Sequence, residues 1–176
     1  QILAQKTGSE LRYIPISDSG ELILDNIDNI IDENTKIVSI IHQSNVFGTI
    51  NSIDEIIKIA HSKGSVVLVD AAQSIAHQKI DVQDLNCDFL VFSGHKMLGP
   101  TGTGCLYVKE NLLKDLEPYQ TGGQMINHVD KKTSTWNDIP FRFEAGTPNI
   151  SSVIAMSAAL DYLNKFGMDK IKSHND

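Results

Sequence analysis

Short apolar runs separated by turn residues recur through the first two thirds of the chain. Four of them are rich in β-branched or aromatic residues and are predicted to be strands: residues 36–41, 66–69, 89–92 and 104–108. Between the first two, Ile53, Ile56, Ile57 and Ala60 recur at helical spacing, which predicts an amphipathic helix that ends at Gly64. This alternation predicts an α/β fold, with a mostly parallel mixed sheet that helices cover on both faces.

Other segments carry weaker structural signals. Ser52 precedes the predicted helix and Glu55 follows three residues later, a pattern typical of a capping box. Ser157–Phe166 has helical character, and the polar stretch Lys172–Asp176 follows it. Thr121–Pro140 is polar and irregular, so we expect a long loop, and loops of that length are frequently functional.

Composition and charge narrow the class of protein. A length of 176 residues suits one ordinary domain. The net charge of -7 argues against a nucleic acid or a membrane as partner, and no apolar run approaches the ~20 residues of a membrane span. Because the chain opens on Gln1 and ends in a polar stretch, we expect it to be a piece of a longer protein.

The two cysteines, Cys87 and Cys105, are too few for a disulfide framework. They suit a reducing, cytoplasmic compartment, although an organelle stays open if a transit peptide lies upstream. Both fall at or within predicted strands, so we expect them to be core residues.

Polar residues follow three of the predicted strands. Asn45, Asp70 and the segment Ser93–Lys96 each lie at or just past a strand's carboxyl end. Open α/β sheets bind ligands at this edge, because the ends of parallel strands meet there. We therefore expect one strongly polar site.

Two of these residues can carry chemistry together. The amine of Lys96 becomes a nucleophile if a crevice lowers its pKa, whereas a lone lysine after a strand is more commonly a surface residue. Asp70 either caps the next helix or pairs with a cation, and a pyridinium nitrogen is one such cation. Ser93 and His95 offer donors to a phosphate, or they make ordinary turn hydrogen bonds.

Other motifs are weak or absent. The segment 99–104, Gly-Pro-Thr-Gly-Thr-Gly, lacks the Gly-Lys-Ser/Thr ending of a nucleotide loop. It is better explained as a turn that lets the backbone pass close to a cofactor or a neighbouring subunit. The sequence contains no Gly-x-Ser-x-Gly, His-Glu-x-x-His or Cys-x-x-Cys, and its six histidines are scattered, so no metal site is expected.

Four ordered motifs resemble one enzyme family. They are His42-Gln-Ser-Asn-Val-Phe-Gly-Thr49, Val69-Asp-Ala-Ala-Gln73, Ser93-Gly-His-Lys-x-x-Gly-Pro-Thr-Gly102 and Arg142-Phe-Glu-Ala-Gly-Thr-Pro148. The sequence is similar to the SufS-type (group II) cysteine desulfurases and the related selenocysteine lyases. These are class V aminotransferases, which are fold type I enzymes that use pyridoxal 5'-phosphate (PLP).

The resemblance implies a role for each motif residue. Lys96 would carry PLP on its side-chain nitrogen and move the substrate's Cα proton. Asp70 would pair with the pyridine nitrogen and Gln73 would contact the ring's phenolic oxygen. Asn45 would lie beside the cofactor, near that oxygen or the substrate carboxylate.

The resemblance also implies which residues of these motifs bind the phosphate of the cofactor. Ser93 and His95 would hold it within one subunit, and Thr147 would reach the phosphate of the partner subunit. The implied enzyme is therefore a homodimer. Gly122 and Gly123 are expected near that shared site.

The implied activity converts L-cysteine to L-alanine and leaves sulfur as an enzyme persulfide for iron–sulfur cluster assembly through a sulfur-acceptor protein. The family's ring-stacking histidine, part of its phosphate loop, its nucleophilic cysteine and its carboxylate-binding arginine match nothing in these residues. We therefore expect residues 1–176 to be the central part of the PLP-binding large domain, without the N-terminal segment and the C-terminal small domain, and to be inactive alone.

Three alternatives stay open. The substrate can be L-selenocysteine, as in a selenocysteine lyase, or the enzyme can be another class V aminotransferase. In a different class, the chain can be a non-catalytic dimerisation or sulfur-acceptor docking module.

Overall fold

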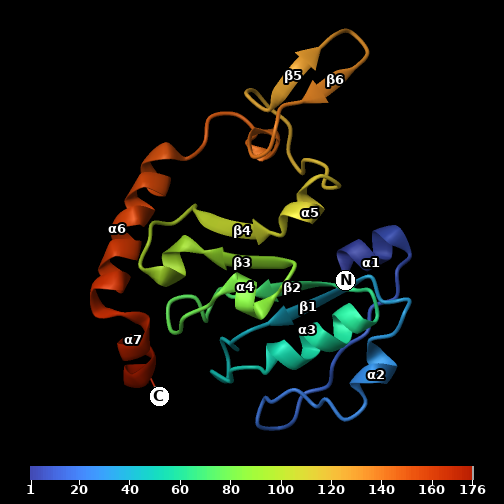
Figure 1. The fold of residues 1–176 in the computed structure, drawn as a ribbon, viewed down its shortest axis with the longest axis vertical. Coiled ribbons are helices and arrows are strands. Elements are labelled where there is room, and N and C mark those ends of the chain that lie inside the picture. Colours follow the sequence, from blue (N-terminus) through green and yellow to red (C-terminus); the bar gives the residue numbers. More distant parts are fainter. Residues whose placement is uncertain (176) are drawn as a thin grey trace.

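The computed structural model describes residues 1–175. Figure 1 shows a central sheet with helices around it and a small hairpin that projects away from it. The strands are β1 (Ile37–Ile41), β2 (Val66–Asp70), β3 (Phe89–Ser93), β4 (Gly104–Val108), β5 (Ile126–Val129) and β6 (Ser134–Trp136). The helices are α1 (Ile2–Thr7), α2 (Ile27–Ile30), α3 (Ile53–Ser62), α4 (Val82–Leu85), α5 (Glu110–Leu113), α6 (Ile150–Phe166), α7 (Met168–Asn175) and the 3₁₀ helices η1 (Gly94–Met97) and η2 (Phe141–Phe143).

The central sheet has the strand order β1-β2-β3-β4. β1, β2 and β3 are parallel, and β4 runs antiparallel to β3. All four correspond to the predicted strands, with ends that shift by at most one residue. The prediction of an α/β fold with a mostly parallel mixed sheet is confirmed.

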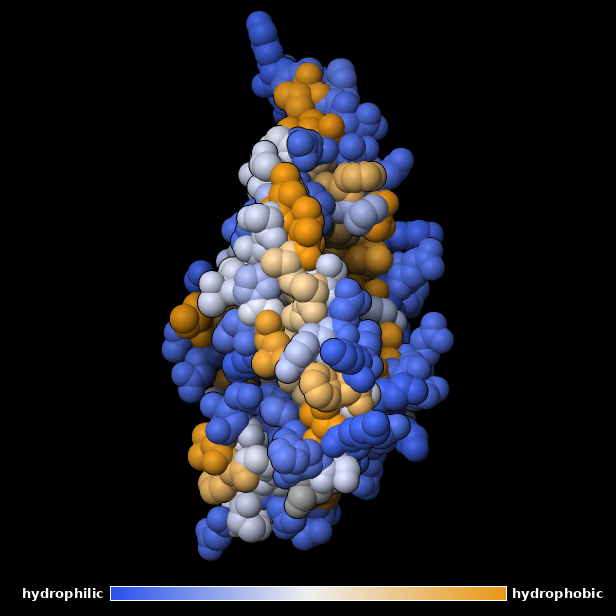
Figure 2. All heavy atoms as spheres, turned by 90° about the vertical axis from the view of Figure 1, so that its left-hand side faces the viewer, coloured by the Kyte–Doolittle hydropathy of each residue, from blue (hydrophilic) through white to orange (hydrophobic). Residues whose placement is uncertain are grey.

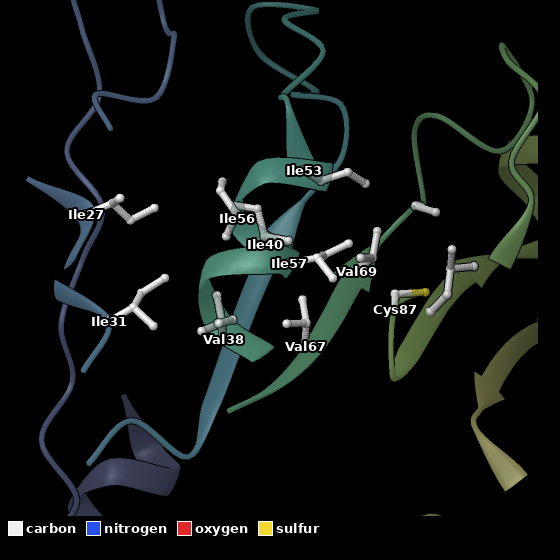
Figure 3. Close-up of a cluster of buried hydrophobic side chains, with 13 residues drawn as sticks. Ile27, Ile31, Val38, Ile40, Ile53, Ile56, Ile57, Val67, Val69 and Cys87 are labelled. Carbon is white, nitrogen blue, oxygen red and sulfur yellow. The ribbon is translucent and has the colours of Figure 1, made fainter. Parts of the chain in front are cut away.

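One face of this sheet forms the hydrophobic core. Figure 3 shows side chains of β1 and β2 pointing toward α3, with residues of the N-terminal segment beside them. The α3 residues of the predicted apolar stripe are at most 2% exposed. The core consists of Ile27, Ile31, Val38, Ile40, Ile53, Ile56, Ile57, Ala60, Val67, Val69, Ala71, Cys87 and Leu90. Full burial of one such aliphatic side chain stabilises the fold by roughly 1.5–3 kcal/mol, so this face holds the sheet together.

The opposite face of the sheet is more open. Ile37 of β1 is 53% exposed and Leu106 of β4 is 56% exposed. The other side chains that point this way, such as Leu68 and Val91, are only partly buried. Within residues 1–175, the expectation that both faces are covered is therefore wrong, because α3 and the N-terminal segment pack on the same side.

The start of α3 differs from the prediction. Ser52 is its N-cap residue, but the Ser52 side chain makes no capping hydrogen bond. Instead, the Ile53 N–H donates to the Asn51 carbonyl, and the Asn51 side chain donates to the carbonyl of Ile41 at 2.8 Å. The capping box is thus wrong, since a buried asparagine anchors this turn to β1. The predicted end at Gly64 is confirmed by its positive φ of 78°.

Two other segments are more ordered than expected. Thr121–Pro140 is not a continuous loop, because it contains the antiparallel hairpin of β5 and β6. α6 begins at residue 150, before the predicted residue 157, and its N-cap Asn149 accepts a hydrogen bond from the Ser152 N–H. The polar stretch after α6 belongs to α7 as far as Asn175, and Asp176 lies outside the described residues.

The α6 side of the molecule keeps apolar atoms at its surface. α6 runs beside the end of β3 and contacts η1 (Figure 1). Hydrophobic groups lie between hydrophilic ones on this side of the molecule (Figure 2). Ile150, Val153 and Ile154 of α6 are each more than half exposed. No helix among residues 1–175 is long and apolar enough to span a membrane.

Candidate active site

The carboxyl ends of β1, β2 and β3 meet at one edge of the sheet. Asp70 of β2 pairs with Ile41 of β1 on one side and with Val91 of β3 on the other. The His42 N–H donates to the Asp70 carbonyl at 2.9 Å, which continues the ladder past β1. The predicted convergence of strand ends is therefore present.

Strand alternation places Asp70 and Ser93 on the same face. Val69 and Leu90 point into the core, and neighbouring residues along a strand point to opposite faces. Asp70 and Val91 consequently share the open face, and Ser93 lies two residues beyond Val91 on that face. A carboxylate and a hydroxyl thus lie at adjacent strand ends on the open face.

The carboxylate of Asp70 retains a free oxygen. Its Oδ1 accepts a hydrogen bond from the Ala72 N–H at 2.9 Å, so the capping alternative is realised, although a turn and not the predicted helix follows β2. Its Oδ2 makes no hydrogen bond or ion pair with residues 1–175. Capping uses one oxygen and leaves the other for a cation, so the two explanations are compatible.

The turn that carries Lys96 is braced by backbone contacts. Ser93 pairs with Gly104 of β4, and the Gly94 N–H donates to the Thr103 carbonyl at 2.9 Å. The 3₁₀ helix η1 then ends at Leu98, which has a positive φ of 65°. Lys96 therefore leaves the sheet one short turn after Ser93, at a defined point of the chain.

The glycines near this turn are needed for close approach. A Cβ atom on Gly104 would lie 2.6 Å from the Phe92 carbonyl oxygen, and one on Gly99 would lie 2.8 Å from the Gly94 carbonyl oxygen. We expected such close approach to a cofactor or a neighbouring subunit. Within the described residues, the backbone approaches its own chain, where it supports the Lys96 turn, and the approach to a cofactor or a neighbouring subunit stays a prediction.

The exposed Lys96 side chain lines a cleft between η1 and the last two helices. This cleft has a volume of about 260 Å³ and is mostly apolar. Its walls include Ala76, Tyr162, Phe166 and Ile171. Lys96 forms no ion pair or hydrogen bond with any residue from 1 to 175, so no described protein group occupies its side-chain nitrogen.

The other predicted residues differ in how close they lie to this edge. Gln73 is half-buried in the turn after Asp70, and the exposed His95 directly precedes Lys96. The exposed Asn45 lies in the turn after β1, where Ser44 Oγ accepts hydrogen bonds from the N–H groups of Val46 and Phe47. These residues follow the three parallel strands, as predicted, although no hydrogen bond joins their side chains to one another.

Thr147 lies apart from this group, just before α6, and is exposed. The segment before it packs on the loop after α5, since the Gly146 N–H donates to the Gly123 carbonyl at 2.9 Å. A Cβ on Gly122 would lie 3.1 Å from the Gly146 nitrogen. The described chain therefore brings Gly122 and Gly123 close to Gly146, the residue before Thr147. No hydrogen bond among residues 1–175 joins Thr147 itself to the Lys96 turn, although the Asn149 side chain donates to the Gly102 carbonyl at 3.5 Å.

Sequence reasoning assigned no role to His42, which directly follows β1. Burial lowers the pKa of the His42 imidazole, and Asp54 opposes this only in part. Its Nε2 lies 3.3 Å from Gln78 Nε2, and its buried Nδ1 has no hydrogen-bond partner among the described residues. His42 lines a separate cleft of about 500 Å³ with Asn51 and Asp54. The signal for this residue was its position directly after a buried strand.

The cysteines lie on the core side of the sheet. Cys87 is fully buried, and burial raises the pKa of its thiol. Cys105 pairs with Phe92 on the face opposite Asp70. It is exposed because β4 is the edge strand of the described sheet, so the expectation of a core residue is wrong for Cys105. In the described part of the chain, no group of three or more His, Cys, Asp or Glu residues could hold a metal ion.

The whole chain matches one protein family. A family model described as aminotransferase class-V matches residues 1–176. A cysteine desulfurase of Haloferax volcanii is 46% identical over 176 residues, which cover 100% of this chain and 41% of that protein. A cysteine desulfurase of Escherichia coli is 48% identical over 175 residues, which cover 99% of this chain and 43% of that protein.

A solved structure shares the fold. The crystal structure of the cysteine desulfurase CsdA of Escherichia coli superimposes with a TM-score of 0.92 at 38% sequence identity. This match covers 96% of the present chain and 42% of the CsdA chain. The chain therefore spans about two fifths of the length of these similar proteins.

Proposed function

Because this chain belongs to the aminotransferase class-V family, we propose that it is the central part of the PLP-binding large domain of a cysteine desulfurase. The full-length enzyme would contain an N-terminal segment and a C-terminal small domain as well. Its substrate would be L-cysteine, its products L-alanine and a persulfide sulfur. The names of the similar proteins and the close structural match to CsdA support this assignment.

The residues of the site fit PLP by their chemistry. PLP presents an aldehyde, a pyridine nitrogen and a phosphate. These residues offer an amine on Lys96 and a carboxylate oxygen of Asp70, each without a partner among residues 1–175, and the Ser93 hydroxyl. When bound, PLP would supply an electron-withdrawing ring that stabilises charge on the substrate's Cα.

Each residue then has a defined task. Asp70 holds a proton on the pyridine nitrogen, because its carboxylate stabilises the cation beside it. Lys96 binds the cofactor and, once its nitrogen is free, moves the proton at the substrate's Cα. Ser93 and His95 hold the phosphate, while Gln73 and Asn45 orient the ring or the substrate.

The homodimer belongs to the same proposal. Thr147 would donate its hydroxyl to the phosphate in the partner subunit, which agrees with its exposed position. A sulfur-acceptor protein would receive the persulfide. The location would be cytoplasmic, and the two free thiols, Cys87 and Cys105, are consistent with a reducing compartment. Neither thiol is the sulfur nucleophile, so residues 1–176 alone would not desulfurate cysteine.

The observation that carries the proposal is the strand register. It places Asp70 and Ser93 on one face at adjacent strand ends, with Lys96 one turn further on. The full-length protein should develop the absorbance of bound PLP and form alanine from cysteine. Lys96→Ala should abolish both signals, and Asp70→Asn should retain PLP while slowing turnover by at least about tenfold.

The control is Lys109→Ala, which removes a lysine on the core side of the sheet that pairs with Asp88. It should leave PLP absorbance intact. If Lys96→Ala bound PLP with the same spectrum and turned over cysteine at the same rate, the proposal would be wrong.

A further inference from the structure

Two loops form a small unit at the base of the β5–β6 hairpin. One runs from residue 114 to residue 125, after α5, and the other from residue 137 to residue 147, through η2. Backbone hydrogen bonds join them at the Asn137 N–H to the Met125 carbonyl, 2.8 Å, and at the Gly146 N–H to the Gly123 carbonyl, 2.9 Å. Met125 is fully buried between them. We call this unit the hairpin base.

Arg142 is the side chain that joins the two loops. Its Nη2 donates to the Leu116 carbonyl at 3.0 Å, across a separation of 26 residues. Its guanidinium carbon lies 5.4 Å from the centre of the Phe143 ring, within the range of a cation–π contact. Arg142 thus connects the start of one loop to the segment that leads to Thr147.

This arginine has no carboxylate partner in the part of the chain that the structure describes. Among residues 1–175, no Asp or Glu oxygen lies within 4.0 Å of its nitrogens, and its buried Nε donates to no acceptor. By contrast Arg12, the other arginine of the chain, pairs with Glu10 and Asp32 at the surface. A part-buried guanidinium that binds a backbone carbonyl instead of an acid serves to fix the backbone.

We propose that Arg142 is a positioning residue: it holds the hairpin base in the geometry that presents the Thr147 hydroxyl to the phosphate of the partner subunit's cofactor. This inference rests on the proposed function, which assigns Thr147 to that phosphate. Arg142 fixes one end of the segment 142–147, and the Gly146–Gly123 hydrogen bond fixes the other. Thr147 follows directly, so its position depends on both attachments.

Lysine is a partial substitute at this position. Its ammonium can donate to the Leu116 carbonyl, but it lacks the planar group that lies over Phe143. Arg142→Met removes the hydrogen bond and keeps an apolar side chain of similar length. Arg142→Lys should therefore retain more function than Arg142→Met.

The test is a double-mutant cycle on PLP affinity, measured by titrating the apo form of the full-length dimer with PLP. Thr147→Val should weaken PLP binding by about tenfold, the effect of one lost hydrogen bond to a charged group. Arg142→Met should weaken it by about three- to tenfold, because Arg142 acts through Thr147 and cannot exceed its effect. The double variant should bind PLP within about twofold of Thr147→Val alone.

Controls separate positioning from general stability. Arg12→Met removes the other arginine and should leave PLP affinity unchanged, while Arg142→Lys should fall between the native protein and Arg142→Met. The melting temperature of each apo variant reports stability independently. Arg142→Gln supplies the same cycle if Arg142→Met does not fold.

The outcomes distinguish the role of Arg142 from the role of Thr147. Additive effects in the double variant, or a lower melting temperature of Arg142→Met with unchanged PLP affinity, would overturn the role of Arg142 and leave that of Thr147 intact. If Thr147→Val alone left PLP affinity unchanged, the proposed role of Thr147 would fail, and the inference about Arg142 with it.

Discussion

The parallel sheet and the hairpin of β5 and β6 are stabilised in different ways. In the sheet, Val67 and Val69 are fully buried against α3, so the core defines the structure. In the hairpin, all of β5 is exposed, and local contacts dominate, such as the Asp130 carboxylate that accepts from the Lys132 and Thr133 N–H groups. The residues proposed to act on PLP lie at the carboxyl end of the buried sheet, whereas Thr147 follows the hairpin base.

The largest expected effect separates the two regions directly. Ile56→Ala should lower the free energy of unfolding by about 2–5 kcal/mol, because it opens a cavity under a fully buried side chain. Val129→Ala, in the hairpin, should change it by less than about 0.5 kcal/mol, since Val129 is 58% exposed. Urea denaturation of both variants measures the difference. If both variants lost the same free energy of unfolding, the sheet core and the hairpin would not differ in how burial stabilises them.

The next effect comes from a buried carboxylate that joins α3, β2 and β4. Asp88 accepts hydrogen bonds from His61 at 2.7 Å, from the Val67 N–H at 2.7 Å and from Lys109 at 2.9 Å. Asp88→Asn should cost about 3 kcal/mol at neutral pH, because the Lys109 ammonium loses its negative partner and one carboxylate oxygen that accepts hydrogen bonds is replaced by an NH2 donor. Urea denaturation at neutral pH measures this loss.

The same carboxylate makes the stability of the sheet depend on pH. Burial alone would raise the pKa of Asp88, but the hydrogen bonds from Lys109, His61 and Val67 outweigh it and hold the pKa below its usual 3.8. A carboxyl whose pKa is lowered by folding stabilises the protein above its unfolded value, and that contribution is lost as the pH falls through the folded value. Native protein should lose stability below pH 3.8 more steeply than Asp88→Asn. If the stability of both proteins fell equally steeply with decreasing pH, the ion pairing of Asp88 would be contradicted.

The smallest expected effect on stability comes from glycines that lie behind the Lys96 turn and in the hairpin base. Gly104→Ala should destabilise the protein by about 1–2 kcal/mol, because its Cβ would lie 2.6 Å from the Phe92 carbonyl oxygen behind the Lys96 turn. Gly123→Ala, in the hairpin base, has no atom within 4 Å of the added Cβ and should be nearly neutral. Thermal unfolding of the two variants checks this, and a larger loss for Gly123→Ala would contradict the close packing of the backbone behind the Lys96 turn.

The sequence predicted the sheet well because its signal is local. Uninterrupted apolar runs such as Val66–Val69 form strands of the buried sheet, so their composition alone predicts them. The apolar stripe of α3 follows from the helical spacing of its residues in the sequence. The hairpin was missed because Ile126–Val129 contains Asn127 and His128 and buries no side chain, so it lacks the pattern of a strand. The capping box failed because Asn51, a residue outside the motif, anchors the turn by a contact across 10 residues.

The site was predictable only in part for the same reason. Strand ends bring Asp70 and Ser93 to one edge, and this convergence follows from alternation and parallel topology. The roles proposed for Thr147 and for the other cofactor residues came from the resemblance to a known family, because no spacing rule links residues that are proposed to act across two subunits. Arg142 could not be found from sequence, since its contact with Leu116 is defined only by the folded loops.

The most direct test of the central claim is to identify the side chain that carries PLP. The full-length protein would be incubated with PLP, treated with borohydride to make the attachment irreversible, and digested for peptide mass mapping. We predict the pyridoxyl mass on the peptide that contains Lys96, and none after Lys96→Ala. A label distributed over surface lysines with Lys96 unmodified would contradict the assignment of this sheet edge as the cofactor site.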